Sequence, residues 1–382
     1  MFRESPYAPI QGINELSDTE IPNRFYYLFD YDTKGRLIRL TQKMGKQNAV
    51  YQADLNRFFV KSPILQIDYP NDSTEIRTYL DHMGKPMSTT HGVMHERHEF
   101  DLQGRTKKAL TFLDSTQTPV QNAWGIMTYE WTDKGPYVLE RRYDSLQQIV
   151  PMRPQLNFFD VALFYDSEGR IEKFVNLDKE GNFSNSDNGM AYDRITYDNQ
   201  GRFVGWKTFT KDHEVTINNA SGIAKGENLI NALGQPFFTY YRDIEGNPTN
   251  SVYGYAKFET LYDAWGNVIG WKFYDADGEL QTIDDANAVS SISEFNDLRQ
   301  LVAYKFVDST GQLTNHSRYG FALINYSYDP QNRIIEERFF DANETPYFFK
   351  QRNAALVKYS YSKDGERTTA LFDTDGKRTD ID

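Results

Sequence analysis

The chain has 382 residues and a formal net charge of -12. An acidic chain of this kind lacks the basic footprint of proteins that bind nucleic acid or anionic membranes, and we expect no such partner. It contains no cysteine, which excludes disulfide bonds, thiolate metal sites and cysteine nucleophiles. Aromatic residues make up 15% of the chain, mostly as Tyr and Phe, and this composition favours strands.

The first 24 residues precede the repeated part of the chain and are predicted to form an N-terminal cap or a loose segment. They contain three prolines, Pro6, Pro9 and Pro22. Repeats are expected over residues 25–376, and residues 377–382 are interpreted as a polar C-terminal tail.

Two stretches disturb the period of the repeats. The first covers residues 43–61 and is interpreted as an insertion, with a helical turn expected at residues 49–58. The second lies near residues 146–159, where Pro151 and Pro154 indicate a kink.

Two Asp-x-x-Gly units recur with a period of about 33 residues. The first unit lies at Asp32, Asp101, Asp166, Asp198, Asp263 and Asp329, with Asp68, Thr132, Asn231, Asn296 and Ser362 at the same phase. The second lies at Asp81, Asp114, Asp144, Asp178, Asp243, Asp275, Asp308, Asp341 and Asp373, with Thr210 in phase. The two series of turn positions keep the same spacing from each other along the chain. This regularity indicates a repeat protein with about ten copies.

Each unit has a physical interpretation. Asp at the first position of a turn accepts backbone N–H bonds, and Gly three places later tolerates the left-handed conformation that closes the turn. Between the units lie seven to nine residues rich in Tyr, Phe, Ile and Val, which is typical of strands. Since one hairpin is marginally stable alone, we predict an all-β fold of tandem hairpins stacked into an elongated or curled solenoid-like sheet.

Aromatic side chains at equivalent phases are the candidates for a binding surface. Trp206 and Trp271 each lie in a Gly-Trp-Lys of the return strand, while Tyr255 and Trp265 lie in the neighbouring strand and turn. Exposed rings can stack on sugars or on peptide rings, and burial between hairpins is the alternative use of these side chains. We therefore name Trp206, Trp271, Tyr255 and Trp265 as candidate binding residues.

Two features resemble metal sites. His91 and His95 share a face of a strand in HGVMHERHEFD, and histidine is the commonest transition-metal ligand. Asp275, Asp277, Asp373 and Asp375 echo calcium loops, but neither segment supplies a clean carboxylate at the twelfth position. Turn formation explains these aspartates without an ion, and we expect no metal and no other cofactor.

The units YDTKGR, YDSEGR, YDNQGR, YDAWGN and FYDADGEL resemble the tyrosine-aspartate repeats of bacterial surface and toxin-shell proteins of the Rhs type. The resemblance covers about residues 25–376. It implies hairpin sheets that wrap a cargo or extend from a cell surface, although the period here is longer and the chain is too short for a closed shell. The N-terminus has no basic-then-apolar signal pattern. We therefore expect a secreted, periplasmic or cell-surface protein whose signal has been removed, with a cytoplasmic location as the alternative.

No G-x-S-x-G elbow, Walker loop or dinucleotide-binding glycine motif is present. We expect a non-enzymatic bacterial protein that offers a binding or scaffold surface to a protein or glycan. One alternative is a polysaccharide-acting enzyme with the array as its groove and two carboxylates as acid and base. Because the chain has 54 acidic residues, carboxylate pairs also arise by chance. Another is an immunity or chaperone-like partner of a toxin, for which the acidic charge would match a basic partner.

Overall fold

The computed structural model describes residues 5–12, 14–50, 62–89, 92–101, 106–153, 156–282, 287–362 and 366–379. Over these residues the fold is all-β, as predicted, with two short 3-10 helices at Ile21–Asn23 and Lys350–Arg352. The chain divides into two compact units, unit 1 (Met1–Gly254) and unit 2 (Tyr255–Asp382).

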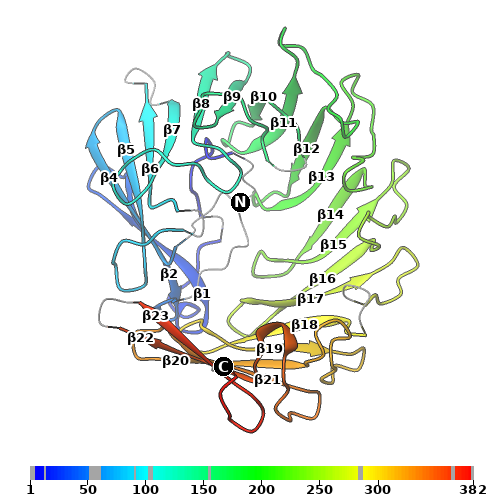
Figure 1. Cartoon of the computed structure of the whole chain (residues 1–382). Helices are drawn as coiled ribbons and strands as arrows, with labels where there is room; N and C mark the ends of the chain where they lie inside the picture. Colours follow the sequence, from blue (N-terminus) through cyan, green and yellow to red (C-terminus); the bar gives the residue numbers. More distant parts are fainter. Residues whose placement is uncertain are drawn as a thin grey trace. The chain divides into compact units, whose positions relative to one another are not determined.

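Unit 1 is an antiparallel sheet in which the strands pair in chain order, except that the second strand pairs both with a two-residue third strand and with the fourth (Figure 1). Its strands are β1 (Phe25–Tyr31), β2 (Leu37–Met44), β3 (Gln47–Asn48), β4 (Ile64–Asn71), β5 (Thr74–Leu80), β6 (His95–Phe100), β7 (Lys107–Leu113), β8 (Thr128–Asp133), β9 (Val138–Tyr143), β10 (Asp160–Tyr165), β11 (Ile171–Leu177), β12 (Tyr192–Tyr197), β13 (Phe203–Phe209), β14 (Lys225–Ile230) and β15 (Pro236–Arg242).

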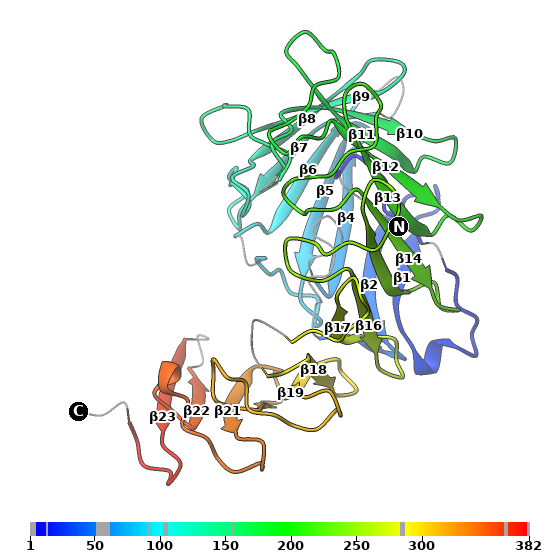
Figure 2. The same cartoon turned by 90° about the vertical axis from the view of Figure 1, so that its right-hand side faces the viewer.

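Unit 2 repeats the same arrangement with four more hairpins (Figure 2). Its strands are β16 (Lys257–Tyr262), β17 (Val268–Tyr274), β18 (Ser290–Phe295), β19 (Leu301–Val307), β20 (Leu323–Tyr328), β21 (Ile334–Phe340), β22 (Leu356–Tyr361) and β23 (Arg367–Phe372). Within the described residues the two units together hold eleven hairpins, against about ten predicted.

The Asp-x-x-Gly turns form as the sequence predicts. In the β12–β13 hairpin, Asp198 Oδ1 accepts the backbone N–H groups of Gln200 and Arg202, both at 2.9 Å. Gly201 has φ 75°, the left-handed conformation that closes the turn. The strand register shifts by one residue between Thr196 and Tyr197, which is the bulge that accompanies a type I turn of this length.

Two of the positions at which the sequence pattern predicts a turn, Asp68 and Thr132, do not begin one. Asp68 lies inside β4, and the β4–β5 turn forms further on, where Ser73 donates its backbone N–H to Asn71. Thr132 lies inside β8, and the next turn is formed by Asp133, whose carboxylate accepts the N–H of Gly135. In both hairpins the turn residues are supplied later in the chain, so the strand continues through the predicted turn position.

The two segments that interrupt the repeat period are only partly within the described residues. The insertion contributes β3, which pairs with β2, while residues 51–61, and with them most of the expected helical turn, lie outside the described residues. At the expected kink, Arg153 pairs with Leu156 in an isolated bridge, and Met152 donates its backbone N–H to Phe158 at 2.8 Å. Residues 154–155 lie outside the described residues.

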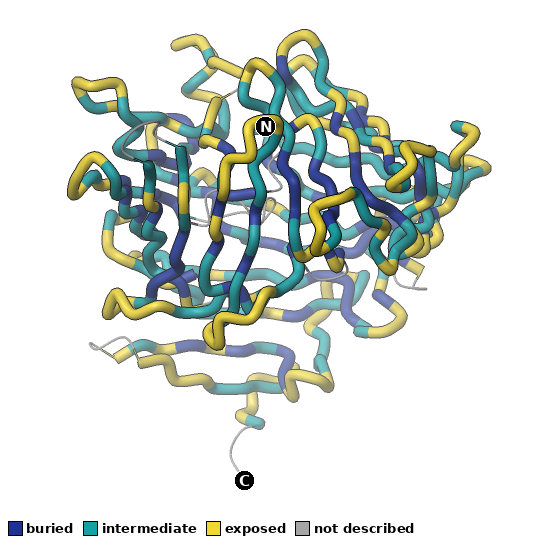
Figure 3. Tube along the Cα trace, turned by 90° about the horizontal axis from the view of Figure 1, so that it is seen from above, coloured by how far each residue is buried: buried dark blue, intermediate teal, exposed yellow. Residues whose placement is uncertain are grey.

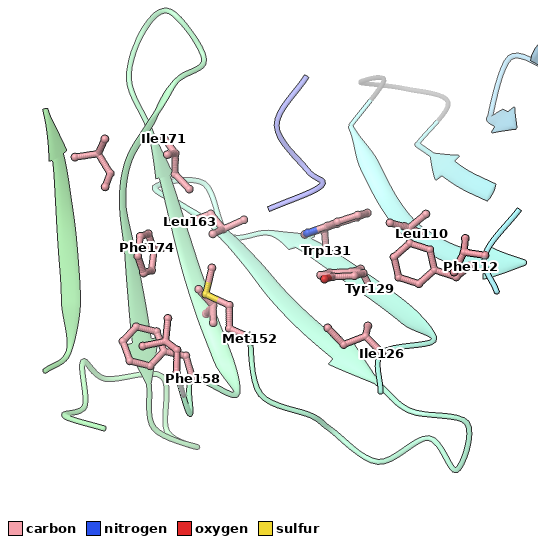
Figure 4. Packing of buried hydrophobic residues seen from close by; sticks show 14 of the residues in the cluster. Leu110, Phe112, Ile126, Tyr129, Trp131, Met152, Phe158, Leu163, Ile171 and Phe174 are labelled. Atoms are coloured by element: carbon pink, nitrogen blue, oxygen red, sulfur yellow. The ribbon is translucent and has the colours of Figure 1, made fainter. Parts of the chain in front are cut away.

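Buried residues lie along the strands, and exposed residues concentrate in the turns and connections (Figure 3). The largest cluster of buried apolar side chains belongs to unit 1 and runs from Leu40 to Ile195. Its central part, around Tyr129, Trp131, Leu163 and Phe174, is shown in Figure 4. Unit 2 has its own cluster, centred on Phe306, Phe321 and Phe339.

Candidate binding surfaces

Trp206 and Trp271 lie on equivalent faces of their strands. Because side chains alternate along a strand and pair across the ladder, the register extends this face through each unit. We call it the tryptophan face. In unit 1 it includes Leu110, Tyr129, Trp131, Glu140, Arg142, Val161, Leu163, Phe174, Asp193, Ile195, Trp206 and Thr208. In unit 2 it includes Phe258, Thr260, Trp271, Phe273, Ser291, Ser293, Tyr304, Phe306, Ile324, Phe339, Val357 and Tyr359.

The tryptophan face of unit 1 is almost completely buried. Leu110, Val161 and Leu163 have no exposed surface, and Trp131 is 3% exposed. Charged residues are buried among these apolar ones, which is expensive unless each charge is paired and hydrogen-bonded.

One buried charge pair joins Glu140 to Arg142. Arg142 donates from a guanidinium nitrogen to Glu140 Oε1 at 2.7 Å, and Trp131 Nε1 donates to Glu140 Oε2 at 2.8 Å. A second guanidinium nitrogen of Arg142 donates to the carbonyls of Phe158 and Phe159. Both charged side chains are therefore satisfied inside the protein, and the pair ties β9 to the connection before β10.

A second buried network joins β5 to β6. His98 Nε2 donates to Glu96 Oε2 at 3.0 Å, Tyr79 donates its hydroxyl to Glu96 Oε1, and Arg77 pairs with Glu75. Burial and the nearby charge of Arg77 lower the pKa of His98 to about 4. Burial alone would raise the pKa of Glu96, but the hydrogen bond from His98 and the positive charges around it outweigh burial and lower that pKa strongly. At neutral pH the network therefore holds a neutral imidazole and an ionised carboxylate.

The N-terminal segment packs on the same face of unit 1. The buried Ser5 donates its hydroxyl to Glu140 Oε2, although the two residues are 135 positions apart. Lys107 Nζ donates to the backbone carbonyls of Pro6 and Tyr7 at 2.8 and 2.9 Å. The Tyr7 ring lies 5.6 Å from each of the rings of Trp131 and Tyr165, and the segment passes beside Trp131 in Figure 4.

The tryptophan face of unit 2 is less covered. Trp271 is 36% exposed, and its neighbours Thr260, Ser293 and Tyr304 are half-buried. Phe306, Phe339 and Val357, further along the unit, are buried. The first two hairpins of unit 2 thus present rings and hydroxyl groups together at the surface.

The side chain opposite each tryptophan explains why the two differ. Trp206 lies over Gly226 of the next hairpin, so closely that a Cβ atom on Gly226 would meet the indole at 2.1 Å. At the same place unit 2 has Ser291, since Gly270 pairs with Ile292. Trp206 also stacks on Phe203 at 6.1 Å and meets Tyr241 edge to face. Gly226 therefore allows the indole of Trp206 to pack flat against the sheet, whereas the indole of Trp271 remains partly exposed.

The four candidate residues from the sequence are only partly brought together. Trp206 belongs to unit 1, whereas Tyr255, Trp265 and Trp271 belong to unit 2. Tyr255 packs against Phe273 at 4.7 Å, two positions along β17 from Trp271. Trp265 lies in the β16–β17 turn, where its backbone N–H bonds to Asp263.

The metal candidates are placed as follows. His91 lies outside the described residues, and His95 Nδ1 is hydrogen-bonded to the Thr78 hydroxyl at 2.9 Å. Asp275 Oδ1 accepts the N–H groups of Asp277 and Glu279, which is the use that turn formation predicts. In the described part of the chain, no group of three or more His, Asp or Glu side chains is placed to hold a metal ion.

Two residue types of the repeat have roles that the turn interpretation missed. Tyr197, at the end of β12, donates its hydroxyl to the carbonyl of Ile171 in the preceding hairpin at 2.9 Å. Arg170 pairs with Asp166 of its own turn and stacks over the ring of Tyr197 at 5.1 Å. The same bonds recur at Tyr69, Tyr328 and Tyr361, with Arg36 and Arg333 over the first and last rings. These contacts could have been predicted from the sequence, because Tyr recurs directly before the Asp of the turn and Arg recurs directly after its Gly.

No protein-family model matches the sequence, and no curated protein matches it. Among solved structures, the chain is similar to chains of TcdB2-TccC3-TEV (12% identity, TM-score 0.33), TcdB2-TccC3-Cdc42 (12%, 0.21) and TcdB2-TccC3 (11%, 0.25). The matches cover 93, 90 and 88% of this chain but only 17, 21 and 19% of those chains. At these TM-scores the likeness carries no argument about function. No helix in the described residues has both the length and the apolar character to cross a bilayer.

Proposed function

We propose that the protein is a non-enzymatic repeat scaffold that binds a protein or glycan partner on the tryptophan face of unit 2. The observation that carries this proposal is the exposure of Trp271 at a phase where Trp206 is packed down. Exposed indole rings supply large contact areas at low entropic cost in protein recognition, and they stack on sugar rings.

The environment of Trp271 supports a binding role. Thr260 pairs across the ladder from Trp271, and Ser291 and Ser293 lie on the next strand, so hydroxyl groups flank the ring. Phe273 and Tyr255 extend the apolar surface beside it. A ring with hydroxyl neighbours offers both an apolar contact and hydrogen bonds, which a glycan or a polar protein surface can use.

The charges on the buried face support a scaffold rather than a catalyst. The carboxylates of Glu140 and Glu96 are buried and hydrogen-bonded to their own neighbours, as structural ion pairs are. The half-buried turn aspartates, such as Asp198 and Asp275, have one carboxylate oxygen engaged by the backbone of the turn. These carboxylates therefore act in folding.

The test uses the full-length chain as a probe on a glycan array and on a panel of purified proteins encoded by neighbouring genes. Trp271→Ala should weaken any specific binding at least tenfold, because it removes the central ring. Lys272→Ala, on the opposite face of β17, is the matched control and should leave the dissociation constant within about twofold. Binding that is indifferent to Trp271, or release of sugars from a bound polysaccharide, would overturn the proposal.

A further inference from the structure

Residues 5–8 have a shape that their own sequence determines. They form a turn in which Ala8 donates its backbone N–H to the carbonyl of Ser5, and Ser5 Oγ accepts the N–H of Tyr7 at 3.0 Å. Pro6 occupies the second position, where its fixed φ favours a turn, and Ser is favoured at the first. A segment with local order of this kind keeps much of its bound shape when it is free, which lowers the entropic cost of binding.

This turn is held on unit 1 by side chains of the kind that bind peptides. Glu140, which has no exposed surface, accepts the hydroxyl of Ser5, and Lys107 binds two successive backbone carbonyls. The ring of Tyr7 lies against Trp131 and Tyr165. The surface thus recognises three features of the segment separately. Glu140 binds the hydroxyl group, Lys107 binds the main chain, and two aromatic rings contact Tyr7.

Beyond the turn, the segment is less buried. Pro9 and Gln11 are exposed, and so is Asn14, whose side-chain amide donates to the carbonyl of Leu233 at 2.9 Å in the β14–β15 turn. Residues 15 to 20 are largely exposed and lead to β1. The anchoring contacts are therefore concentrated in residues 5–8, and the rest of the segment acts as a tether.

We propose that the tryptophan face of unit 1, at β7–β10, is a peptide-binding surface that the chain's own residues 5–8 occupy. Its ligand class is a turn-forming peptide with a hydroxyl residue two positions before an aromatic residue, as in Ser5-Pro6-Tyr7. This peptide-binding surface is separate from the one proposed above for Trp271, and either proposal can fail without the other. Since the tether keeps the local concentration of the segment high, a free peptide can compete only when the tether is cut or the partner binds tightly.

The test is a cut-and-exchange experiment on the full chain. A protease site is inserted in the exposed stretch between Ser17 and Thr19, the protein is folded and purified, and the tether is then cut. A fluorescent peptide of residues 5–16 should replace the cut segment, giving a saturable rise in anisotropy, while the circular dichroism of the sheet stays unchanged.

Peptide variants identify the contacts. Tyr7→Ala and Ser5→Ala should each weaken binding about tenfold or more, because each removes a buried anchor. Gln11→Ala is the matched control at an exposed position and should bind within twofold of the parent peptide. Lys107→Gln in the protein should weaken binding of the parent peptide as well, since it removes the donor to the two carbonyls.

Three outcomes would overturn the proposal: loss of the fold on cutting, no uptake of the peptide by the cut protein, or uptake that ignores Ser5 and Tyr7. If the uncut chain forms a dimer that the peptide dissociates, the peptide-binding surface is supported and its partner is the same segment of a second copy. The signal does not depend on Trp271, so Trp271→Ala should leave it unchanged even if the function proposed for unit 2 is wrong.

Discussion

The two units contain the same hairpin, yet they use its tryptophan face differently. In unit 1 the face is covered and carries buried ion pairs such as Glu140 with Arg142, both without exposed surface. In unit 2 the corresponding face is built largely from rings, and the surface ion pair between Arg338 and Glu336 lies on the opposite face of β21. The comparison teaches that the turns define the hairpin, while the neighbours across each strand decide whether a face becomes core or surface.

The largest effect should come from removing one partner of a buried pair. Glu140→Ala leaves Arg142 buried without its carboxylate and also removes the acceptor of Trp131 and Ser5. A loss of about 3–5 kcal/mol in the free energy of unfolding is expected. Urea unfolding followed by tryptophan fluorescence measures it.

Glu336→Ala is the control for this prediction in unit 2. Glu336 pairs with Arg338 at 2.9 Å, and half of the Arg338 side chain is exposed, so the loss should stay within about 1 kcal/mol. Equal losses for Glu140→Ala and Glu336→Ala would contradict the contrast drawn between a buried and a partly exposed ion pair.

Acidification should also act on unit 1 first. The folded pKa of His98 is about 4, below its ordinary value of 6.5, so the folded protein resists a proton that the unfolded chain accepts. Stability from this group is complete above pH 6.5 and is lost as pH falls toward 4, by up to about 3 kcal/mol.

Unfolding curves at pH 7, 6, 5 and 4.5 test this sign. The variant His98→Gln can still donate toward Glu96 but cannot titrate, so it should have a flatter stability profile between pH 6.5 and 4 than the original protein. If the stability of His98→Gln falls with pH as steeply as that of the original protein, the pH dependence does not come from His98. Because Glu96 and Glu75 face the same cluster, their protonation should add a further loss only at lower pH.

The sequence predicts the hairpins because their cause is local. Asp198 and Gly201 lie three residues apart and close the turn themselves. The covering of unit 1 was not predictable in this way, because it depends on contacts such as Ser5 with Glu140, 135 positions apart. Trp206 and Trp271 look alike within their own strands, and only the residue on the next strand separates them. The tyrosine and arginine that join hairpins recur visibly, but their partners lie in neighbouring repeats.

The difference between the two tryptophans can be tested at the residue opposite each. Gly226→Ala should push the indole of Trp206 off the sheet and cost about 1–3 kcal/mol, with a red shift in fluorescence. Ser291→Ala, at the equivalent place in unit 2, should change stability by no more than about 0.5 kcal/mol. If Gly226→Ala is as mild as Ser291→Ala, close packing on glycine is not what covers Trp206.

The smallest effect should be the same in both units, because it concerns the turns that they share. Gln147 in unit 1 and Glu344 in unit 2 have φ of 61° and 60° in the turn that follows the return strand, at the position that glycine occupies in most repeats. Residues with a Cβ atom lose about 1 kcal/mol in this conformation. Gln147→Gly and Glu344→Gly should therefore each raise the free energy of unfolding by up to about that amount, and thermal unfolding can measure both. Both side chains are exposed, so little packing is lost to offset the gain. Equal increases in the free energy of unfolding would mean that the two units differ in their faces and not in their turns. An increase in only one unit would mean that the turns differ too.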